Sequence, residues 1–474
     1  MTERIETDIC VIGAGSGGLT VAAGASQMGA RTVLIERGRM GGDCLNYGCV
    51  PSKALLAAAH AAVAWRRADA FGIEAEAPRI DHARVYAHVA RVIAGIAPHD
   101  SQERFEGLGV RVLRSSARFT GPTEVEAGGT TVRARRFVVA TGSSPLVPPI
   151  PGLEDVPTLT NETIFEQSQF PRRLIVVGGG PVGVELAQAH RRLGAEVVLV
   201  ELASLLPRDD PEAVEIVRRS LRADGVILRE GTRVTAVTGN GAGVVAAVEK
   251  DGTAERIEGS HLLLAAGRKP TVDGLGLEAA GIEHGNRGIR VDDRLRTSNA
   301  RVYAIGDVTG DLQFTHMAGY QAAVVLRNAL FRLPARVDRR AVPWVTYTDP
   351  ELAHVGIGEA AARAEGRPFR VLRWAFAEND RARAERQIEG HVKAIVSPRG
   401  RVLGATIVGR QAGELILPWV MAVRERMGVS RLASLIAPYP TLGEAGKRAA
   451  GSFYAERLFG EGTKRLVRML LSLG

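Results

Sequence analysis

A short apolar run leads into the first recognisable element of the chain. Residues 8–12 are mostly apolar and end abruptly in Gly13, Gly15 and Gly18. An Ala-rich, helix-like segment follows to about residue 29, and a second apolar run at 31–36 ends in an acid, Glu36. A strand, a Gly-rich turn, a helix and a strand that ends in an acid together predict a βαβ unit.

The same pattern recurs in the middle of the chain. Apolar residues at 174–177 run into Gly178, Gly180 and Gly183, a helical segment covers 184–193, and a strand at 196–201 ends in Glu201. In both units the first glycine and the terminal acid are 23 positions apart. One such glycine turn is a weak signal because Gly-rich turns are common, but two in the same context indicate two dinucleotide-binding units.

Weaker patterns divide the remainder of the chain. Apolar stretches at 134–141 and 260–266 end in Gly142 and Gly267, and a cluster of prolines predicts a linker near 145–157. From about residue 341 the pattern changes to hairpin-like strands and amphipathic helices, without a third nucleotide turn. We expect a separate domain there. The 474 residues agree with about three domains at ~150 residues each.

Composition and charge narrow the class of protein. With 45% hydrophobic and 24% charged residues, the chain is typical of a globular protein and not of a disordered or fibrous one. The net charge of +9 would suit a nucleic-acid partner. However, only 6 of the 61 basic residues are Lys and the other 55 are Arg, scattered along the whole chain. We interpret this as a compositional habit and expect no nucleic-acid partner.

Cysteine usage and the amino terminus favour the cytoplasm. Three Cys are too few for a secreted disulfide scaffold. The first eight residues are polar and of mixed charge, unlike a signal peptide. No apolar run approaches the ~18 residues of a membrane span. We therefore expect a cytoplasmic protein.

The glycines and acids of the two units have a direct physical role. Glycine lets the backbone approach a pyrophosphate at a helix N-terminus, where free N–H groups point outward. Glu36 and Glu201 would accept hydrogen bonds from a ribose diol, and an acid also repels a 2′-phosphate, so Glu201 favours NADH over NADPH. The alternatives are plain tight turns and, for Glu201, a merely solvated strand end.

A pair of cysteines follows the first unit, in the run GGDCLNYGCVPSK at 41–53. Cys44 and Cys49 lack the further Cys or His ligands of a structural zinc site. A helix that begins near them would lower a thiolate pKa, and Lys53 adds positive charge. With the nucleotide motifs present, we favour a redox-active pair over two unremarkable thiols. Cys10 lies in an apolar strand, where we expect a buried small hydrophobe.

This run closely resembles the active-site signature of the class I pyridine nucleotide–disulfide oxidoreductases, which include dihydrolipoamide dehydrogenase, glutathione reductase and mercuric reductase. The resemblance extends over essentially the whole chain. Further motifs fall in the order of that family: ATG at 140–142, AAGRKPT at 265–271, YAIGD at 303–307 and PYPTLGE at 438–444. Together they are specific for fold and cofactors and much less so for substrate.

The resemblance implies an α/β fold with two three-layer, Rossmann-like dinucleotide-binding domains and an α+β carboxy-terminal dimerisation domain. An FAD-binding domain would cover 1–150 and 275–340, an NAD(P)-binding domain 151–274, and the dimerisation domain 341–474. The cofactors would be FAD and NAD(H), with NADP(H) as an alternative to NAD(H). The protein would be a homodimer, with Tyr439 and Glu444 entering the active site of the partner.

The same resemblance places the cofactors on individual residues. FAD would lie along Gly13, Gly15, Gly18 and Glu36, with Asp307 at its ribityl or pyrophosphate region and Gln313, Phe314, Thr315 and His316 near the flavin ring. NADH would bind at Gly178, Gly180, Gly183, Glu201 and Gly267. Further cofactor-binding positions would be Gly42, Ala117, Thr141, Gly142 and Val234.

The resemblance also implies a mechanism. Hydride would pass to FAD, and the reduced flavin would transfer two electrons to a Cys44–Cys49 disulfide. Lys53, paired with Glu185, would lie near the reactive flavin nitrogen. Cys49 would lie against the flavin as the thiolate, and Cys44 would be the thiol that attacks the substrate. Because thiol–disulfide exchange needs a protonated leaving group, a base is expected beside Cys44.

That base is where this sequence departs from the disulfide-handling members, which carry a His immediately before the Pro-Thr of the carboxy-terminal motif. Here the position is Tyr439, although the following acid, Glu444, is present. A phenol with a pKa of about 10 is a poor base at neutral pH, but it can donate a hydrogen bond or, when ionised, ligate a metal. The alternative is that Tyr439 only fills space and has no chemical role.

A tyrosine here is similar to mercuric reductases, which deliver Hg(II) to the inner cysteines through a carboxy-terminal Cys pair. This chain has no Cys after Cys49, so a metal-ion substrate would have to reach Cys44 and Cys49 directly. We expect a mercuric-reductase-like oxidoreductase that acts on a soft metal ion or a small disulfide. A dihydrolipoamide dehydrogenase variant is the alternative, and a membrane-docked redox partner protein is a distant third.

The carboxy-terminal tail, residues 457–474, alternates basic and apolar residues at helical spacing. One interpretation is a helix that binds a membrane surface or a partner, because such a helix needs basic and apolar faces together. The other is a terminal helix packed on its own domain, which is the interpretation that we favour from the sequence.

Overall fold

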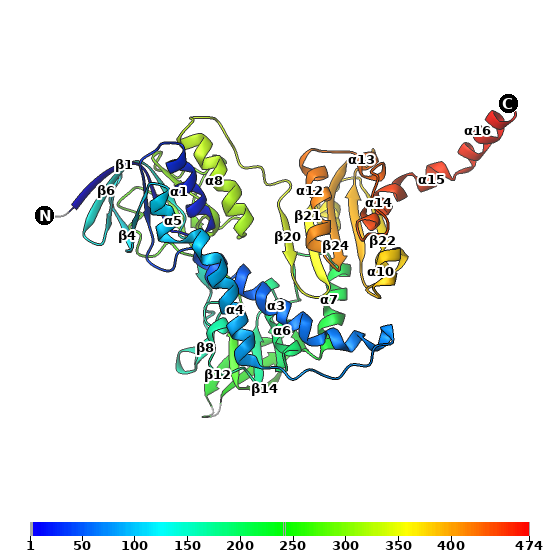
Figure 1. Cartoon of the computed structure of the whole chain (residues 1–474), viewed down its shortest axis with the longest axis horizontal. Helices are drawn as coiled ribbons and strands as arrows, with labels where there is room; N and C mark the ends of the chain where they lie inside the picture. Colours follow the sequence, from blue (N-terminus) through cyan, green and yellow to red (C-terminus); the bar gives the residue numbers. More distant parts are fainter. Residues whose placement is uncertain (1–2, 240, 242, 474) are drawn as a thin grey trace. The chain divides into compact units, whose positions relative to one another are not determined.

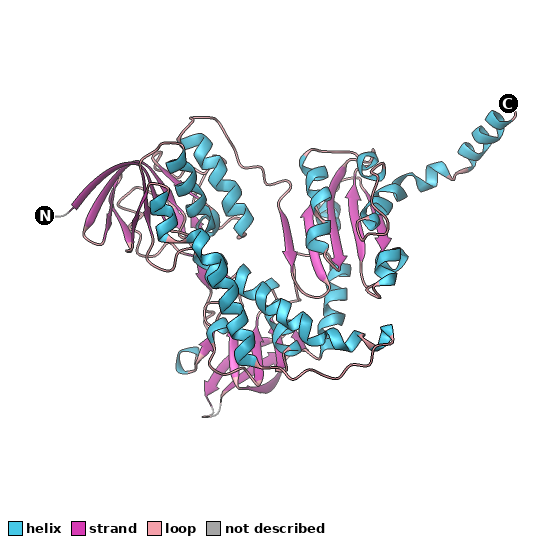
Figure 2. Ribbon diagram, in the orientation of Figure 1, coloured by secondary structure: helices cyan, strands magenta, loops and turns pink. Residues whose placement is uncertain are grey.

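The computed structural model describes residues 3–239, 241 and 243–473. These residues form two compact units (Figures 1 and 2). Unit 1 comprises Met1–Leu202 and Ile227–Val337, and unit 2 comprises Ala203–Val226 and Asp338–Gly474. Each unit has its own buried core and is described by itself.

The first sheet of unit 1 is built around the amino-terminal strand. Its neighbouring strands run in the order β3-β2-β1-β6-β5-β4, with β19 also paired to β6. The parallel strands are β1 (Glu3–Ile12), β2 (Thr32–Ile35), β3 (Val110–Leu113), β6 (Thr130–Val139) and β19 (Val302–Ala304), and the antiparallel extension is β4 (Ala117–Gly121) and β5 (Glu124–Ala127). The first predicted βαβ unit is therefore β1-α1-β2, as expected from its pattern.

Helices connect and cover this sheet. In Figure 1, α1 (blue) and α8 (yellow-green) lie side by side. The helices of this part are α1 (Ser16–Gln27), α2 (Gly42–Asn46), α3 (Cys49–Val63), α4 (His82–Ile96), α5 (Gln102–Gly107) and α8 (Thr315–Ala329). Cys10 is fully buried near the carboxyl end of β1, which confirms its predicted role as a small hydrophobe.

The second sheet of unit 1 repeats the architecture. It is fully parallel, in the order β11-β10-β9-β15-β8, with α6 (Pro181–Arg192) on one side and a three-stranded antiparallel sheet on the other. Apolar side chains of both sheets fill the layer between them. The strands are β8 (Thr158–Leu159), β9 (Arg173–Val177), β10 (Glu196–Glu201), β11 (Ile227–Glu230), β15 (His261–Leu264), and β12 (Arg233–Gly239), β13 (Val244–Lys250) and β14 (Thr253–Gly259).

Two short strand pairs complete unit 1. They are β7 (Ser143–Pro145) with β16 (Arg268–Pro270), and β17 (His284–Gly285) with β18 (Gly288–Ile289). The first pair brings the segment after the ATG motif against the AAGRKPT motif, although about 125 residues separate them in sequence. This pairing positions residues of the candidate site.

Unit 2 is built on a five-stranded antiparallel sheet in the order β20-β21-β24-β23-β22. Its strands are β20 (Pro343–Thr346), β21 (Glu351–Gly356), β22 (Arg370–Ala375), β23 (His391–Val396) and β24 (Val402–Gly409). Its helices are α7 (Pro211–Asp224), α9 (Glu359–Ala364), α10 (Asp380–Ala384), α11 (Ala412–Leu415), α12 (Leu417–Arg424), α13 (Val429–Ala433), α14 (Glu444–Gly451), α15 (Ala455–Leu458) and α16 (Glu461–Leu471). The predicted change of texture near residue 341 thus marks an α+β unit.

One helix of unit 2 comes from the middle of the chain. Residues 203–226, which include α7, lie inside the predicted segment 151–274 but group with unit 2. α7 contacts β21 and β24, and an ion cluster joins its start to the sheet: buried Lys393 Nζ on β23 lies 2.7 Å from buried Asp210 Oδ2 at the N-cap of α7 and 2.6 Å from Glu359 Oε2. Burial opposes the charge of Lys393, but the bonds to Asp210 and Glu359 hold its pKa above the ordinary value.

The carboxy-terminal helix corrects an expectation. We favoured a tail packed on its own domain, yet α16 buries none of its residues. In Figure 1 it extends away from the sheet of unit 2 (red). Among the described residues, no helix combines the length and apolar composition needed to cross a bilayer.

Candidate redox and nucleotide site

The two cysteines lie on consecutive helices of unit 1. Cys44 is within α2, and Cys49 is the first residue of α3, directly after the N-cap Gly48. Both are free thiols, so the structure corresponds to the dithiol form of the pair. The start of α3 at Cys49 gives this thiol the helix N-terminus that the sequence suggested.

The two thiols differ in acidity. A hydrogen bond from Cys44, together with Thr315 and the charge of Lys53, lowers the pKa of Cys49 to about 6. The same hydrogen bond, with burial, raises the pKa of Cys44. Thr315 Oγ1 lies 3.5 Å from Cys49 Sγ, at the start of α8. At neutral pH the pair therefore holds one thiolate, on Cys49, and one thiol, on Cys44.

Lys53 follows Cys49 by one turn of α3. Its Nζ lies 2.8 Å from Oε2 of Glu185, which is buried on α6 behind the second glycine turn. The structure thus brings together the two residues that the resemblance pairs. The ion pair joins the redox helix to the second nucleotide unit, and it places a positive charge near the thiolate.

Both glycine turns are locked by contacts within the chain. Gly13 and Gly178 have positive φ angles of 105° and 115°, where a side chain would be strained. A Cβ on Gly18 or Gly183 would lie 1.9 Å from the carbonyl oxygen of the first glycine of its own turn. No residue larger than glycine fits these four positions.

The middle glycines are different, because their surroundings leave room. A Cβ on Gly180 would meet no atom within 4 Å, and one on Gly15 would meet only the Cα of Gly42 at 4.0 Å. Both residues are the N-caps of helices that have no side-chain cap, α6 and α1. The chain therefore presents two open cradles of backbone N–H groups, which fit the pyrophosphates of two dinucleotides.

The acids at the ends of the second strands lie at these turns. Glu36 accepts hydrogen bonds from the backbone N–H groups of Ala14, at 2.6 Å, and Gly38, at 2.5 Å. Glu201 likewise accepts one from Gly179 N–H at 2.6 Å. The two units therefore match in the position of the acid as well as in sequence spacing.

A charged network that the sequence reasoning missed surrounds the cysteines. Arg268 Nη2 lies 3.1 Å from Asp43 Oδ1, and its Nε donates to Ser143 Oγ at 2.7 Å. Ser143 in turn donates to Asp307 Oδ2 at 2.6 Å, and burial raises the pKa of Asp307 against this bond. Asn161 donates to Asp43 Oδ1 and to the carbonyl of Tyr47.

This network connects the residue before Cys44 with the acid predicted to hold FAD. The signal available in the sequence was Arg268 inside AAGRKPT and Asp43 inside the cysteine motif. Neither could be singled out, because their partners lie more than 100 residues away in the chain.

The other predicted cofactor positions are distributed over unit 1. Thr141 donates to the carbonyl of Thr271, while Phe314 stacks on His316 with ring centroids 5.2 Å apart. Gly142 and Gly267 have positive φ; a Cβ on Gly142 would meet no atom within 4 Å, and one on Gly267 would lie 3.7 Å from the side chain of Leu146. Gly42 approaches Gly15, and Gln313 lies two residues before α8. Ala117 is buried in the core of the first sheet, and Val234 packs, partly buried, against the core of the second. Their contacts with a cofactor stay predictions.

Tyr439 and Glu444 belong to unit 2. Tyr439 is 71% exposed and donates a hydrogen bond to Asp380 Oδ2 at 3.2 Å. This bond raises the pKa of the phenol, so it stays protonated at neutral pH. Glu444 is the first residue of α14. Their entry into the active site of a partner stays a prediction.

No set of three or more Cys, His, Asp or Glu side chains that could hold a metal ion occurs in residues 3–239, 241 and 243–473.

Comparison with known proteins agrees with this geometry. Residues 7–322 match the family described as pyridine nucleotide-disulphide oxidoreductase, and residues 342–450 match its dimerisation domain. The chain belongs to this family. Members use FAD and NAD(P)H, and the dimerisation domain of this oxidoreductase supports a homodimer.

Curated relatives of this oxidoreductase carry two different names. A mercuric reductase from Streptomyces lividans is 35% identical over 457 residues, which cover 95% of this chain and 96% of that protein. A dihydrolipoyl dehydrogenase from Thermus scotoductus is 37% identical over 463 residues, covering 95% and 98%. The family is thus established, and the substrate is not decided by similarity.

Solved structures confirm the fold. LpdA from Mycobacterium tuberculosis has a TM-score of 0.86 at 30% identity and covers 95% of this chain and 99% of its own. A Cu(II) complex of the HOCl-induced flavoprotein disulfide reductase RclA from Escherichia coli has a TM-score of 0.84 at 28% identity and covers 93% and 99%.

Proposed function

We propose that the protein uses NADH to reduce a soft metal ion, such as Hg(II), or a small disulfide at Cys44 and Cys49, and that the metal ion is the better substrate. The observation that carries the preference for metal is the state of Tyr439. Its phenol is hydrogen-bonded to Asp380 with a raised pKa, so it cannot take the proton that disulfide exchange requires.

Metal reduction places a smaller demand on proton transfer. Cys49 is already a thiolate at neutral pH, and thiolates are the ligands that soft ions prefer. Binding of a cation also favours loss of the Cys44 proton, whose pKa is raised in the free dithiol. The overall reaction would convert NADH and Hg(II) to NAD⁺, one proton and Hg(0), so the electrons balance.

The chain offers a place for each cofactor. We infer that FAD binds the first cradle, at Gly13, Gly15, Gly18 and Glu36, with Asp307 and the Lys53–Glu185 pair nearby. When bound, FAD supplies the chemistry that turns hydride from NADH into two electrons for the cysteines. Lys53 stabilises negative charge beside Cys49, and Thr315 donates a hydrogen bond to its thiolate.

The second cradle would bind the reductant. Its acid, Glu201, lies at the turn through its bond to Gly179, in the position where a carboxylate repels a 2′-phosphate. We therefore propose NADH over NADPH. Because NADH is a cytoplasmic reductant, we place the reaction in the cytoplasm.

A dihydrolipoamide dehydrogenase variant is the second candidate. The observation that favours it is the dihydrolipoyl dehydrogenase from Thermus scotoductus, which is as similar to this chain as the mercuric reductases are. The mercuric reductases and the Cu(II) complex of RclA favour the metal.

The deciding experiment compares substrates under one set of conditions. Steady-state NADH oxidation by the FAD-loaded dimer is measured with Hg(II), Cu(II), lipoamide and glutathione disulfide, then repeated with NADPH. The proposal predicts that a metal ion gives the highest kcat/KM, that NADH exceeds NADPH by about tenfold, and that Cys44→Ser abolishes metal turnover. Lipoamide as the fastest substrate would instead support the second candidate.

A further inference from the structure

The tail of the chain has no role in the site described above. Residues 451–474 lie beyond both segments that match the family, which end at 322 and 450. This tail contains α15 and α16, joined at Gly460, and α16 buries no residue. It therefore lies outside the segments by which the family is recognised.

The residues of α16 divide into two faces. At 100° per residue, one stripe contains Glu461, Lys464, Arg465, Arg468 and Ser472. The opposite arc is mainly apolar and continues two residues past the helix; it contains Leu466, Val467, Met469, Leu470, Leu471 and Leu473, together with Gly462 and Thr463. The six apolar side chains are 47–78% exposed, which is unusual for six neighbouring apolar residues.

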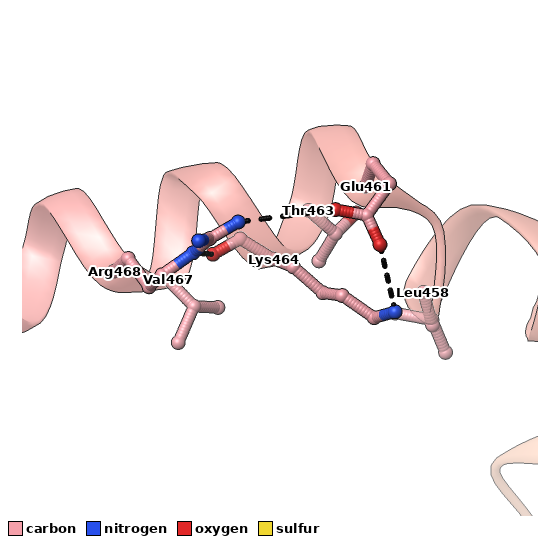
Figure 3. A pocket seen from close by; sticks show the side chains of 6 residues that line it. All are labelled: Leu458, Glu461, Thr463, Lys464, Val467 and Arg468. Carbon is pink, nitrogen blue, oxygen red and sulfur yellow. Dashed lines mark hydrogen bonds and ion pairs between the residues drawn. The ribbon is translucent and has the colours of Figure 1, made fainter.

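The polar face is cationic. It holds three basic side chains against one acid, and Figure 3 shows that Glu461 is engaged within the helix by Lys464 at 2.9 Å and Arg468 at 3.8 Å. Arg465 is the third basic residue of this face, and Arg457 precedes the helix. These charges flank the exposed apolar residues of the same helix.

The apolar face and the basic face of α16 together indicate which kind of partner binds this helix. A partner helix would cover a narrow apolar seam, whereas here the apolar arc occupies more than half of the helix circumference. α16 has 11 residues and is too short to span a bilayer. A wide apolar face beside a short cationic face is the pattern of a helix that lies in the plane of an anionic bilayer surface.

We propose that residues 457–473 bind the surface of an anionic lipid bilayer, with the apolar arc of α16 among the acyl chains and its basic residues at the headgroups. Phe459, 74% exposed directly before α16, would enter the same interface. The tail would hold the oxidoreductase at a membrane without crossing it, whichever substrate the enzyme reduces.

Vesicle co-sedimentation of the FAD-loaded, full-length protein tests this. The vesicles are phosphatidylcholine with about 30% phosphatidylglycerol, and phosphatidylcholine alone. We expect the partition coefficient to be at least about tenfold higher on the anionic vesicles, and to fall in about 0.5 M NaCl. Equal binding to both vesicle types would contradict the role of the basic face.

Matched variants locate the effect. Leu466→Asp should lower the partition coefficient by about tenfold or more, whereas Leu333→Asp, on a leucine of unit 1 with the same 51% exposure, should not change it. A chain ending at Gly460 should bind at the background level while retaining NADH oxidation, which shows that it is folded. Partition of the shortened chain equal to that of the parent would overturn the proposal.

A second measurement separates the other occupants. Sedimentation velocity should show the same number of subunits per particle for the parent and for the shortened chain. If the shortened chain forms a smaller oligomer and the parent does not bind vesicles, α16 pairs with a second copy of the chain, and the bilayer proposal is wrong.

Discussion

The pKa values of two thiols five residues apart are shifted in opposite directions by their immediate neighbours. Cys49 gains a hydrogen bond from Cys44, a second from Thr315 and the field of Lys53, so its pKa falls to about 6. Cys44 supplies that bond and is itself partly buried, so its pKa rises. The division of roles implied by the resemblance thus has a local electrostatic cause.

This asymmetry predicts the pH dependence of alkylation. Because the thiolate is the reactive form and the pKa of Cys49 is lowered, its reaction rate with iodoacetamide in the dithiol form should rise through pH 6 and level off near neutrality. Thr315→Val should move the midpoint upward. A midpoint near the ordinary thiol value of about 8.5 would show that the neighbours do not act as described.

Tyr439 predicts a gain of function. Tyr439→His should raise turnover of lipoamide or glutathione disulfide by at least about tenfold, because an imidazole with a pKa near 6.5 can accept the proton that the phenol cannot. Hg(II) turnover should change little. If steady-state NADH oxidation with disulfides is no faster in the variant, Tyr439 is not what limits them.

Among the secondary-structure elements, the two βαβ units have glycine turns of the same construction. Each begins with a positive-φ glycine, closes on a third glycine in backbone contact, and leaves the middle glycine facing open space. The first and third glycines therefore serve the fold, and the middle one serves the ligand.

This division predicts that two alanine substitutions, three residues apart, have different effects. Gly183→Ala should lower the free energy of unfolding by about 3 kcal/mol, because its Cβ would overlap the carbonyl of Gly178. Gly180→Ala should cost less than about 1 kcal/mol, since φ is −74° and no atom is near, yet weaken NADH binding about tenfold.

Urea unfolding and calorimetric titration with NADH measure both effects. Normal NADH affinity in a folded Gly180→Ala protein would mean that this turn does not hold the dinucleotide.

The sequence was informative where interactions are local. The glycine turns, the acids 23 positions later and the helix start at Cys49 all depend on neighbours within one βαβ unit or one turn. Arg268 and α7 were not anticipated, because their partners are distant in the chain. Asp210 looks like an ordinary helix N-cap until Lys393, 183 positions later, is seen buried against it.

For the tail, the pattern predicted an amphipathic helix but could not say what covers its apolar face. Periodicity reports that one side of a helix is apolar, and it is silent about whether a domain, a partner or a lipid lies there. In the structure α16 has no buried residue, so its own domain does not cover the apolar face.

In the whole molecule, the ion cluster at Lys393 holds a helix from the middle of the chain to unit 2. Lys393→Met should destabilise the protein by about 3–5 kcal/mol, because it leaves the buried Asp210 carboxylate without its cation. Lys269→Met is the matched control, since its pair with Asp273 is exposed and screened by solvent and should contribute little to stability. Comparable urea midpoints for the two variants would show that the buried cluster is not important for stability.

In the proposed reaction, NADH delivers its electrons to Cys44 and Cys49. The most direct measurement is anaerobic addition of NADH to the oxidised, FAD-loaded dimer, followed by alkylation and mapping of the labelled peptides by mass. We expect new labels at Cys44 and Cys49 in each chain, with Cys10 protected by burial in both states. No increase in labelling at these two cysteines after NADH would contradict it.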